Sequence, residues 1–343
     1  MKKLLRIFLL FLAFVAVAFA TFWYARPYDL VFADQRALVP HSEHSRFVEI
    51  DGVRVHFQEK GSGPPLVLLH GNNSSVYTWK DVFDELAVRH RVVAVDLKGF
   101  GFTSKPEGDY RAEAQAALVV RLMDELKIKS AVWCGSSFGG GVALAAAINH
   151  PERVRGLVLV DSAAFSEHRG ASLAPAFVKW PYIGAAVSAL ALSSDSLVRE
   201  GLKQSFYDDS KVTDERVAAY YLPLTTRGGQ YAARRVRLQR NFERVEQLLG
   251  KATQPALLIW GAEDRLILLE DGRRLQSSLP DARLVVFDSC GHLPQEEMPE
   301  RFAREVLDFT ARFKTASPTV REGVAKEPEV VGDEPKSGGK PSS

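Results

Sequence analysis

The stretch that decides the fold is CGSSFGGG, residues 134–141, which contains the pattern G-x-S-x-G. It lies between an apolar run typical of a strand, residues 131–134, and an Ala-rich run typical of a helix, residues 138–149. Small residues on both sides allow a turn so sharp that Ser137 projects its hydroxyl from the sheet edge in a strained conformation. The pattern therefore predicts a nucleophilic serine at position 137, whereas Ser136 stands at the wrong position for this spacing.

Short β-rich runs alternate with amphipathic helical stretches on both sides of this turn. Residues 47–59 alternate apolar and polar around Asp51-Gly52, which favours a type I′ hairpin. The further expected strands are residues 66–69, 91–97, 131–134, 154–160, 256–260 and 284–287, and the expected helices are residues 76–89, 113–126, 138–149 and 301–313. Apolar strands separated by helices predict a mostly parallel sheet covered on both faces, with ligands bound beyond the carboxyl ends of the strands.

Ser137 needs a base and an orienting acid, because a hydroxyl alone is a poor nucleophile. His292 follows the last predicted strand, and Asp264 follows the strand before it. Both therefore lie on loops at the edge where Ser137 is expected. Asp161 ends another strand and competes with Asp264 for the role of the acid, and Glu263 is a lesser candidate.

The loop after the strand at residues 66–69 reads His70-Gly71-Asn72. In this arrangement the backbone N–H groups of Asn72 and Phe138 are expected to form an oxyanion hole. We expect His70 to brace the loop rather than to act as the base.

Composition excludes several classes of protein. The chain has 343 residues, of which 46% are hydrophobic and 25% are charged, values that exclude wholesale disorder and a polytopic membrane protein. With 44 Lys and Arg against 42 Asp and Glu the net charge is +2, so charge gives no reason to expect a nucleic-acid partner. Two cysteines are too few for a structural zinc site or a disulfide framework.

The N-terminus has the features of a membrane-targeting segment. Lys2, Lys3 and Arg6 precede an apolar run at residues 7–24. The run is long enough to cross a hydrocarbon core of ~30 Å, which predicts an uncleaved anchor with its basic end in the cytoplasm. Cleavage after Ala20 and secretion are the alternative. Both predict a catalytic part outside the cytoplasm, in the periplasm if the source is bacterial.

From about Arg46 to Phe313 the chain resembles the α/β-hydrolases typified by bacterial esterases, monoacylglycerol lipases and meta-cleavage-product hydrolases. The motifs that carry the resemblance are HGN at residues 70–72, DLKGFG at residues 96–101, the serine turn, Asp264, and Gly291-His292. The order Ser, Asp, His is that of this family. The resemblance implies an eight-stranded, mostly parallel sheet with helices on both faces and a helical cap.

The implied domain layout follows from this resemblance. Residues 45–162 and 254–314 would form the core and residues 163–253 the cap, between a targeting segment at residues 1–28 and a disordered tail at residues 315–343. The implied sheet order separates Cys134 and Cys290 by two strands. Both are therefore expected to be buried free thiols.

The residues and the resemblance together predict a serine hydrolase that cleaves carboxylic esters, with lipid monoesters as one candidate class. Ser137 would attack, His292 would accept its proton and Asp264 would orient the imidazole, and no metal or organic cofactor is required. Two alternatives stay open: a C–C bond hydrolase of the meta-cleavage type, although Ser136 replaces the Asn common there, and a hydrolase-fold ligand receptor with slow turnover. The expected partners are a small ester or lipid and a membrane.

Overall fold

The computed structural model describes residues 2–166 and 194–313. The expected tail at residues 315–343 and residues 167–193 of the expected cap lie outside these residues. The described chain contains one eight-stranded sheet in the order β1-β2-β4-β3-β5-β6-β7-β8. Its strands are β1 Ser45–Ile50, β2 Val53–Lys60, β3 Pro65–Leu69, β4 Arg91–Val95, β5 Ala131–Ser136, β6 Val154–Val160, β7 Ala256–Gly261 and β8 Ala282–Phe287.

Only β2 runs against its neighbours in this sheet. It pairs antiparallel with β1 and β4, and every other neighbouring pair is parallel. Asp51 and Gly52, which join β1 to β2, have φ values of 50° and 76°, so both residues are left-handed as a type I′ turn requires. The expected hairpin and the mostly parallel sheet are confirmed.

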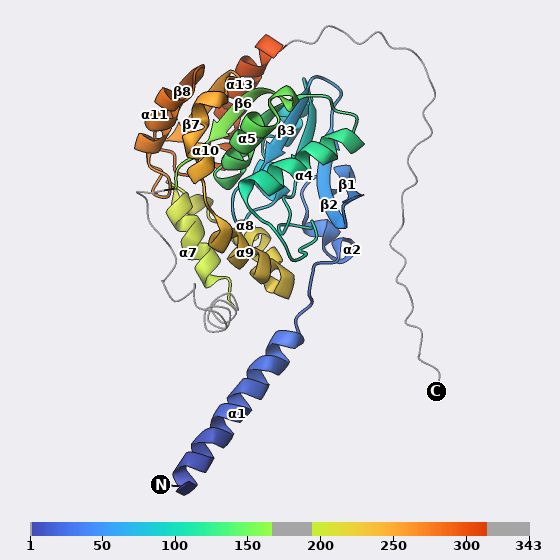
Figure 1. The fold of residues 1–343 in the computed structure, drawn as a ribbon, viewed down its shortest axis with the longest axis vertical. Coiled ribbons are helices and arrows are strands. Elements are labelled where there is room, and N and C mark those ends of the chain that lie inside the picture. The colour runs from blue at the N-terminus through green and yellow to red at the C-terminus, as the bar shows by residue number, and fades with distance from the viewer. Residues whose placement is uncertain (1, 167–193, 314–343) are drawn as a thin grey trace, which may run out of the picture.

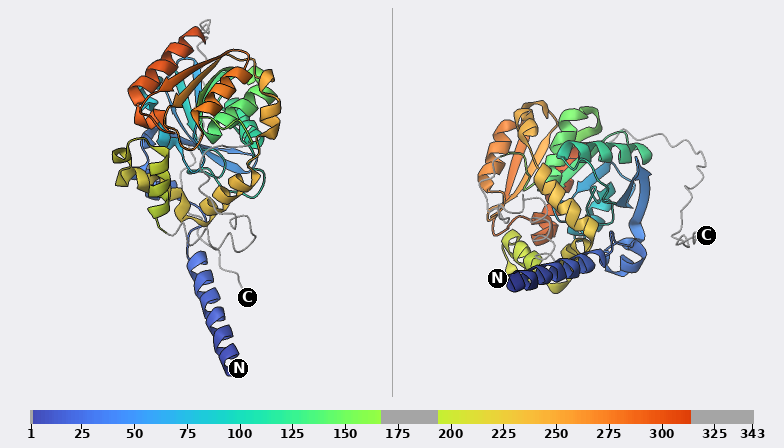
Figure 2. Two further views of the ribbon diagram at one scale, coloured as in Figure 1. Left: turned by 90° about the vertical axis from the view of Figure 1, so that its left-hand side faces the viewer. Right: turned by 60° about the horizontal axis from the view of Figure 1, so that its bottom comes forward.

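Helices cover both faces of the sheet, as expected (Figures 1 and 2). One face packs on α4 Ala112–Glu125, α5 Phe138–Asn149 and α11 Leu269–Ser278. The other face packs on α3 Phe83–Ala87 and α13 Pro299–Thr310. Successive side chains of a strand alternate between the faces, so Trp133 belongs to the first core layer and Cys134 to the second. Cys134 and Cys290 are both buried free thiols, which confirms the expectation.

Two expected helices are shorter than predicted. Residues 76–89 form a 3₁₀ helix, η3 Val76–Trp79, followed by α3, and α13 ends at Thr310 before the 3₁₀ helix η9 Ala311–Phe313. In η3 the Val76 N–H donates to Asp96 Oδ1 at 2.7 Å and Ser75 caps the turn. The position of Asp96 depends on the sheet, so hydrophobic periodicity could not reveal this 3₁₀ start.

A group of helices lies between β6 and β7, beyond the carboxyl ends of the parallel strands (Figure 1). It includes α7 Ser196–Ser205, α8 Asp214–Tyr221 and α9 Arg227–Gln239, whereas α10 Glu243–Gln247, the next helix in the chain, lies beside α5. The hydroxyls of Thr213 and Thr226 cap α8 and α9 by accepting backbone N–H bonds. The remaining short helices are α2 Phe32–Gln35, η1 Arg36–Leu38, η2 Ser42–His44, η4 Pro151–Arg153, η6 Asp209–Lys211, η7 Leu222–Thr225, η8 Leu249–Lys251 and α12 Pro294–Glu297.

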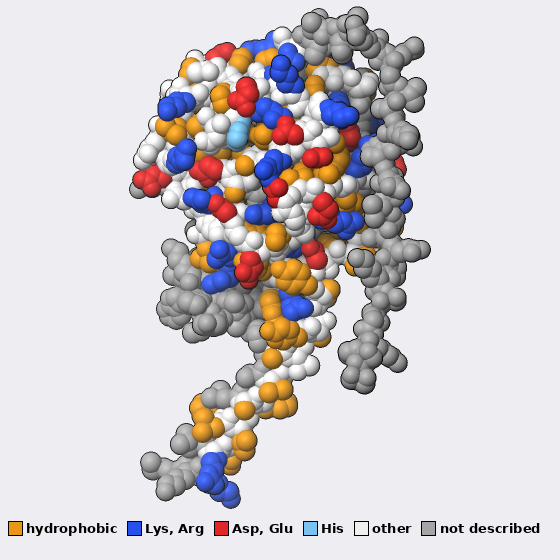
Figure 3. All heavy atoms as spheres, turned by 45° about the vertical axis from the view of Figure 1, so that its right-hand side comes forward, with side chains coloured by type: hydrophobic (Ala, Val, Ile, Leu, Met, Phe, Trp, Pro, Cys, Tyr) orange, Lys and Arg blue, Asp and Glu red, His pale blue; other side chains and the backbone are white. Residues whose placement is uncertain are grey.

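The N-terminal segment forms helix α1 Lys2–Tyr24, which projects away from the rest of the molecule in Figures 1 and 2. Apolar side chains, Leu10 and Phe14 among them, are exposed along α1, and Figure 3 shows hydrophobic atoms on its visible face. Among the helices of the described residues, none combines the length and hydropathy needed to span a membrane. The expected transmembrane anchor is therefore not supported, and the cellular location stays a prediction.

Residues 26–29, which we call the strap, connect α1 to the folded core. The carbonyls of Pro27 and Tyr28 accept the N–H groups of Arg227 and Gly228 at 3.0 and 2.7 Å, at the N-terminus of α9. The carboxylate of Asp29 pairs with the ammonium of Lys105, whose side chain is fully buried. Residues 26–28, the last part of the expected targeting segment at residues 1–28, therefore contact the start of α9.

We expect Asp29→Ala to lower the free energy of unfolding by about 2 kcal/mol, because it leaves a buried ammonium without its carboxylate. The carbonyls of Gly101 and Thr103, at 3.0 and 3.1 Å, then remain as acceptors for Lys105. Urea denaturation measures the change. Asp34→Ala removes an exposed carboxylate a few residues away and is the control. An equal effect of the two substitutions would show that the ion pair contributes nothing.

Candidate active site

Ser137 joins β5 to α5 in a strained conformation, with φ 52° and ψ −116°. Its N–H donates to Val160 O at 2.8 Å, which ties the turn to β6. A Cβ at Gly135 would lie 2.2 Å from Gly139 O, and one at Gly139 would lie 2.3 Å from Leu69 O. Only glycine fits at these two positions, so the local sequence forces the turn that presents Ser137.

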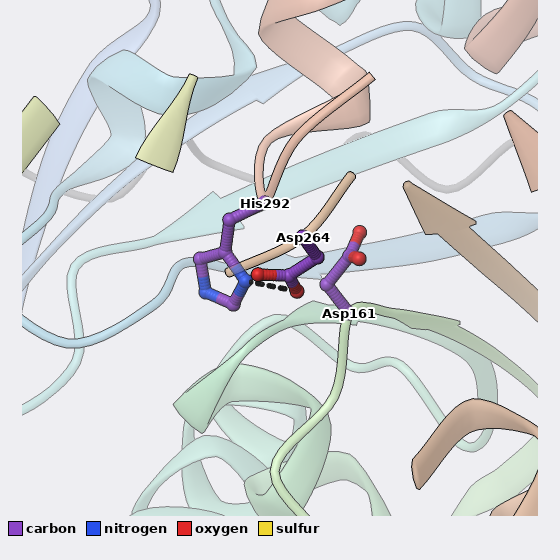
Figure 4. Close-up of side chains that lie close together, drawn as sticks. All are labelled: Asp161, Asp264 and His292. Atoms are coloured by element: carbon purple, nitrogen blue, oxygen red, sulfur yellow. Dashed lines mark hydrogen bonds and ion pairs between the residues drawn. The ribbon is translucent and has the colours of Figure 1, made fainter. Parts of the chain in front are cut away.

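His292 and Asp264 form a buried hydrogen-bonded pair (Figure 4). The distance from His292 Nδ1 to Asp264 Oδ2 is 2.7 Å, and the two residues are 6% and 4% exposed. The other carboxylate oxygen, Oδ1, accepts the N–H groups of Leu266 and Ile267 at 2.7 and 3.1 Å. A carboxylate at this position holds the proton on Nδ1 and leaves a lone pair on Nε2, the form in which a histidine acts as a base.

Asp161, the competing acid, lies behind Asp264 and not against the histidine. In Figure 4 Asp264 lies between His292 and Asp161. Asp161 Oδ1 accepts the N–H of Gly261 at 3.0 Å. Burial, together with the negative charge of Asp264, raises the pKa of Asp161 well above its ordinary value. Glu263, the lesser candidate, is exposed.

The loop that follows β3 lies against the serine. A Cβ at Gly71 would lie 3.1 Å from Ser137 Cβ. His70 holds this loop, since Nδ1 donates to Gly71 O at 2.7 Å and Nε2 accepts the Leu97 N–H at 3.0 Å. Burial lowers the pKa of His70, which suits the neutral imidazole that these two bonds require.

The two groups expected to form an oxyanion hole lie at this junction. Phe138 is the first residue of α5, where a backbone N–H has no partner within the helix. Asn72 directly follows Gly71 and is exposed. Both N–H groups therefore belong to backbone near Ser137: Phe138 follows it in the chain, and Asn72 follows Gly71, which lies against it.

Sequence reasoning missed the residues that hold the His292 loop. The His292 N–H donates to Ser205 O, at the end of α7, at 2.7 Å. The Glu297 carboxylate accepts the N–H groups of Gly291 and Tyr207 at 2.7 and 2.9 Å, so it joins the histidine loop to the segment after α7. The signal in the sequence was the adjacent pair of carboxylates Glu296 and Glu297, placed soon after the histidine.

Glu296 forms a second link between the core and these helices. Its carboxylate is buried and accepts the hydroxyl of Thr78 at 2.6 Å and the hydroxyl of Tyr220. Arg216, on α8, pairs with it at 2.8 Å. The guanidinium of Arg216 is thus neutralised by a buried carboxylate of the core.

Asp161, Asp264 and His292 offer ligand atoms within 4.8 Å of one another, and no other group of this kind occurs in the described residues. Two ligands of one zinc ion lie about 3.4 Å apart, from bond lengths near 2.1 Å and tetrahedral angles. The 2.7 Å contact between Nδ1 and Oδ2 is shorter than that. The arrangement therefore suits a hydrogen-bonded pair better than a metal centre.

Comparison with known proteins identifies the family of this fold. The sequence matches the family described as alpha/beta hydrolase fold over residues 64–299. It is 33% identical over 285 residues to 2-hydroxymuconate semialdehyde hydrolase of Pseudomonas sp. (strain CF600), covering 80% of this chain and 96% of that protein.

Two solved structures are similar to this chain over nearly their whole length. One is a meta-cleavage product hydrolase from Pseudomonas fluorescens IP01, with 30% identity, a TM-score of 0.69, and coverage of 79% of this chain and 99% of that one. The other, described as a membrane phospholipase A and a bacterial virulence factor, has 25% identity and a TM-score of 0.67, with coverage of 91% and 99%. This chain belongs to the α/β-hydrolase fold family and is a hydrolase of that fold.

Proposed function

We propose that this hydrolase cleaves carboxylic esters through an acyl-enzyme on Ser137, with lipid monoesters as its substrate class. The observation that carries the proposal is the buried hydrogen bond between His292 Nδ1 and Asp264 Oδ2, at the sheet edge where the strained turn presents Ser137. The proposed nucleophile, base and orienting acid come from three loops that follow the carboxyl ends of parallel strands.

The proton path follows from the tautomer of His292. Asp264 holds the proton on Nδ1, so Nε2 accepts the proton of Ser137 Oγ while Oγ attacks the ester carbonyl. The imidazolium then gives that proton to the departing alcohol, which leaves an acyl-serine. Water attacks the acyl group, His292 again accepts a proton, and the carboxylic acid and free Ser137 are released.

The negative charge of the tetrahedral intermediate develops beside the turn. The N–H groups of Phe138 and Asn72 are the donors proposed to stabilise the oxyanion, and the N-terminus of α5 adds a favourable dipole. His70 supports this arrangement by fixing the backbone at Gly71. Such donors act strongly because they are already oriented before the charge appears.

Two observations favour a lipid ester over a small acidic substrate. The similarity to the membrane phospholipase A covers 91% of this chain, whereas the similarity to the meta-cleavage product hydrolase covers 79%. In addition, the buried guanidinium of Arg216 is paired with Glu296, so it is not free to bind a substrate carboxylate. A neutral acyl chain needs no such cation.

A second candidate function is hydrolysis of a C–C bond in a meta-cleavage product. It is favoured by the 33% identity to 2-hydroxymuconate semialdehyde hydrolase over 80% of this chain. The same serine, histidine and aspartate would serve in both reactions. The difference between them therefore lies in the substrate and not in the three side chains.

Turnover of three substrate classes by the purified full-length protein separates the candidates. We expect kcat/KM for monoacylglycerols and p-nitrophenyl esters to exceed kcat/KM for 2-hydroxymuconate semialdehyde by at least about 100-fold, a difference of ~2.7 kcal/mol in transition-state binding. The reverse order would reject the ester proposal in favour of C–C hydrolysis. Negligible turnover of every class would favour a ligand receptor.

A further inference from the structure

Two carboxyl groups, Asp161 and Asp264, lie side by side in the buried site (Figure 4). Both are buried, at the carboxyl ends of the neighbouring strands β6 and β7. Two ionised carboxylates this close in a buried place repel each other, so the pair favours a single negative charge. The hydrogen-bond donors around the pair indicate which of the two residues carries that charge.

The donors are distributed unequally between the two carboxyl groups. Asp264 accepts the N–H groups of Leu266 and Ile267 and the ring N–H of His292. Asp161 accepts the N–H of Gly261 on Oδ1, and within the described residues no donor reaches its buried Oδ2. An ionised carboxylate is an acceptor at both oxygens, whereas a protonated one needs fewer donors and can itself donate. The larger number of hydrogen-bond donors around Asp264 indicates that Asp264 carries the negative charge and Asp161 the proton.

We infer that Asp161 is an uncharged carboxylic acid and a positioning residue, which keeps Asp264 as the single anion facing His292. The effect of Asp161 on catalysis rests on the proposed function, whereas the protonation of Asp161 is independent of it. Asp161 makes no contact with the substrate in this proposal. It acts through Asp264, as a neutral partner that accepts the Gly261 N–H.

The surrounding charges agree with a proton on Asp161. Burial, the charge of Asp264 and a hydrogen bond to it all raise the pKa of Asp161, and Glu297 raises it further. Burial also raises the pKa of Glu297 itself. The other titratable groups at this place are His292, already paired with Asp264, and the thiol of Cys290, whose pKa is raised by burial.

The charge of Asp161 matters for the base. A second anion behind Asp264 would stabilise the imidazolium form of His292. A histidine that is protonated at neutral pH cannot accept the proton of Ser137. A neutral Asp161 therefore keeps His292 available as a base.

The first test measures stability and needs no catalytic activity. Folding of the wild type above pH ~4 must take up a proton on Asp161, because the unfolded side chain titrates near ~3.9. This raised pKa stabilises the folded wild type at low pH, and the benefit is lost as pH rises. Asp161→Asn has no proton to take up. We expect its unfolding constant, relative to the wild type, to fall as pH rises above 5, by up to about tenfold per pH unit.

Glu263→Gln, which neutralises an exposed carboxylate on the same loop as Asp264, is the matched control. Its stability relative to the wild type should be independent of pH over this range. A difference between Asp161→Asn and the wild type that is equally constant with pH would overturn the inference, since it would mean that Asp161 is ionised in the folded protein. Measurements in EDTA exclude a contribution from metal ions.

The second test uses the pH profile of ester hydrolysis. Asn resembles the protonated acid, so Asp161→Asn should retain most of kcat. Asp161→Leu removes the carboxyl group that is hydrogen-bonded to Asp264, so the full charge of Asp264 acts on the imidazolium. This variant should lower kcat at least about tenfold, with the acid limb of kcat/KM moved to higher pH. Equal losses in both variants without a shift of that limb would contradict a positioning role. If no variant or wild type hydrolyses an ester, the proposed function fails while the stability test still stands.

Discussion

Ser137→Ala is expected to lower kcat for ester hydrolysis by about 10⁵-fold to 10⁶-fold, the scale seen when a serine nucleophile is removed from a triad. The substitution removes the Oγ that forms the acyl-enzyme, and no neighbouring hydroxyl can take its place. Ser136 is buried in β5, ahead of the strained turn that presents Ser137. The residual rate would come from binding and the oxyanion donors.

Ser136→Ala is the matched control for this prediction. Its Oγ is buried, with no hydrogen-bond partner in the described residues, so its removal leaves no group unpaired. This variant should keep its activity and should still be labelled by a fluorophosphonate, a probe that bonds to an activated serine. Labelling of Ser137→Ala, or loss of labelling in Ser136→Ala, would show that the nucleophile is assigned to the wrong residue.

Much of the fold could be predicted because its signals are local. The hairpin at Asp51-Gly52 and the turn at Ser137 both depend on residues that favour one backbone conformation. Strand β6 and helix α5 have the predicted bounds because an apolar run and an Ala-rich run decide them. The pairing of His292 with Asp264 was predictable because both residues follow strands that end at one edge of the sheet.

Other features depend on residues far apart in the chain, so sequence patterns could not show them. The start of η3 involves Asp96, which lies 20 residues from Val76. The ion pair of Asp29 with the buried Lys105 spans 76 residues. The arrangement of Asp161 and Asp264 also depends on the fold. The sequence makes both candidates for the acid that orients His292, whereas in the structure Asp264 lies between His292 and Asp161 (Figure 4).

Asp264→Asn should lower kcat by about 10⁴-fold at neutral pH with little change in melting temperature. The backbone around Asp264 decides which atom of the new amide faces the histidine. The N–H groups of Leu266 and Ile267 point at Oδ1, so the amide oxygen of Asn must accept them. The NH₂ group then faces His292 Nδ1 and donates to it. This bond requires the proton on Nε2, the atom that should accept the proton of Ser137.

Glu263 provides the matched control for Asp264→Asn. Glu263→Gln makes the same change of charge one residue earlier, on an exposed side chain, and should leave kcat within about threefold of the wild type. Because the amide keeps both backbone hydrogen bonds, Asp264→Asn should unfold at nearly the wild-type temperature, so its loss of activity would reflect the tautomer and not the fold. If it retains more than about a tenth of wild-type kcat, Asp264 does not set the protonation of His292, and the acid must be sought elsewhere.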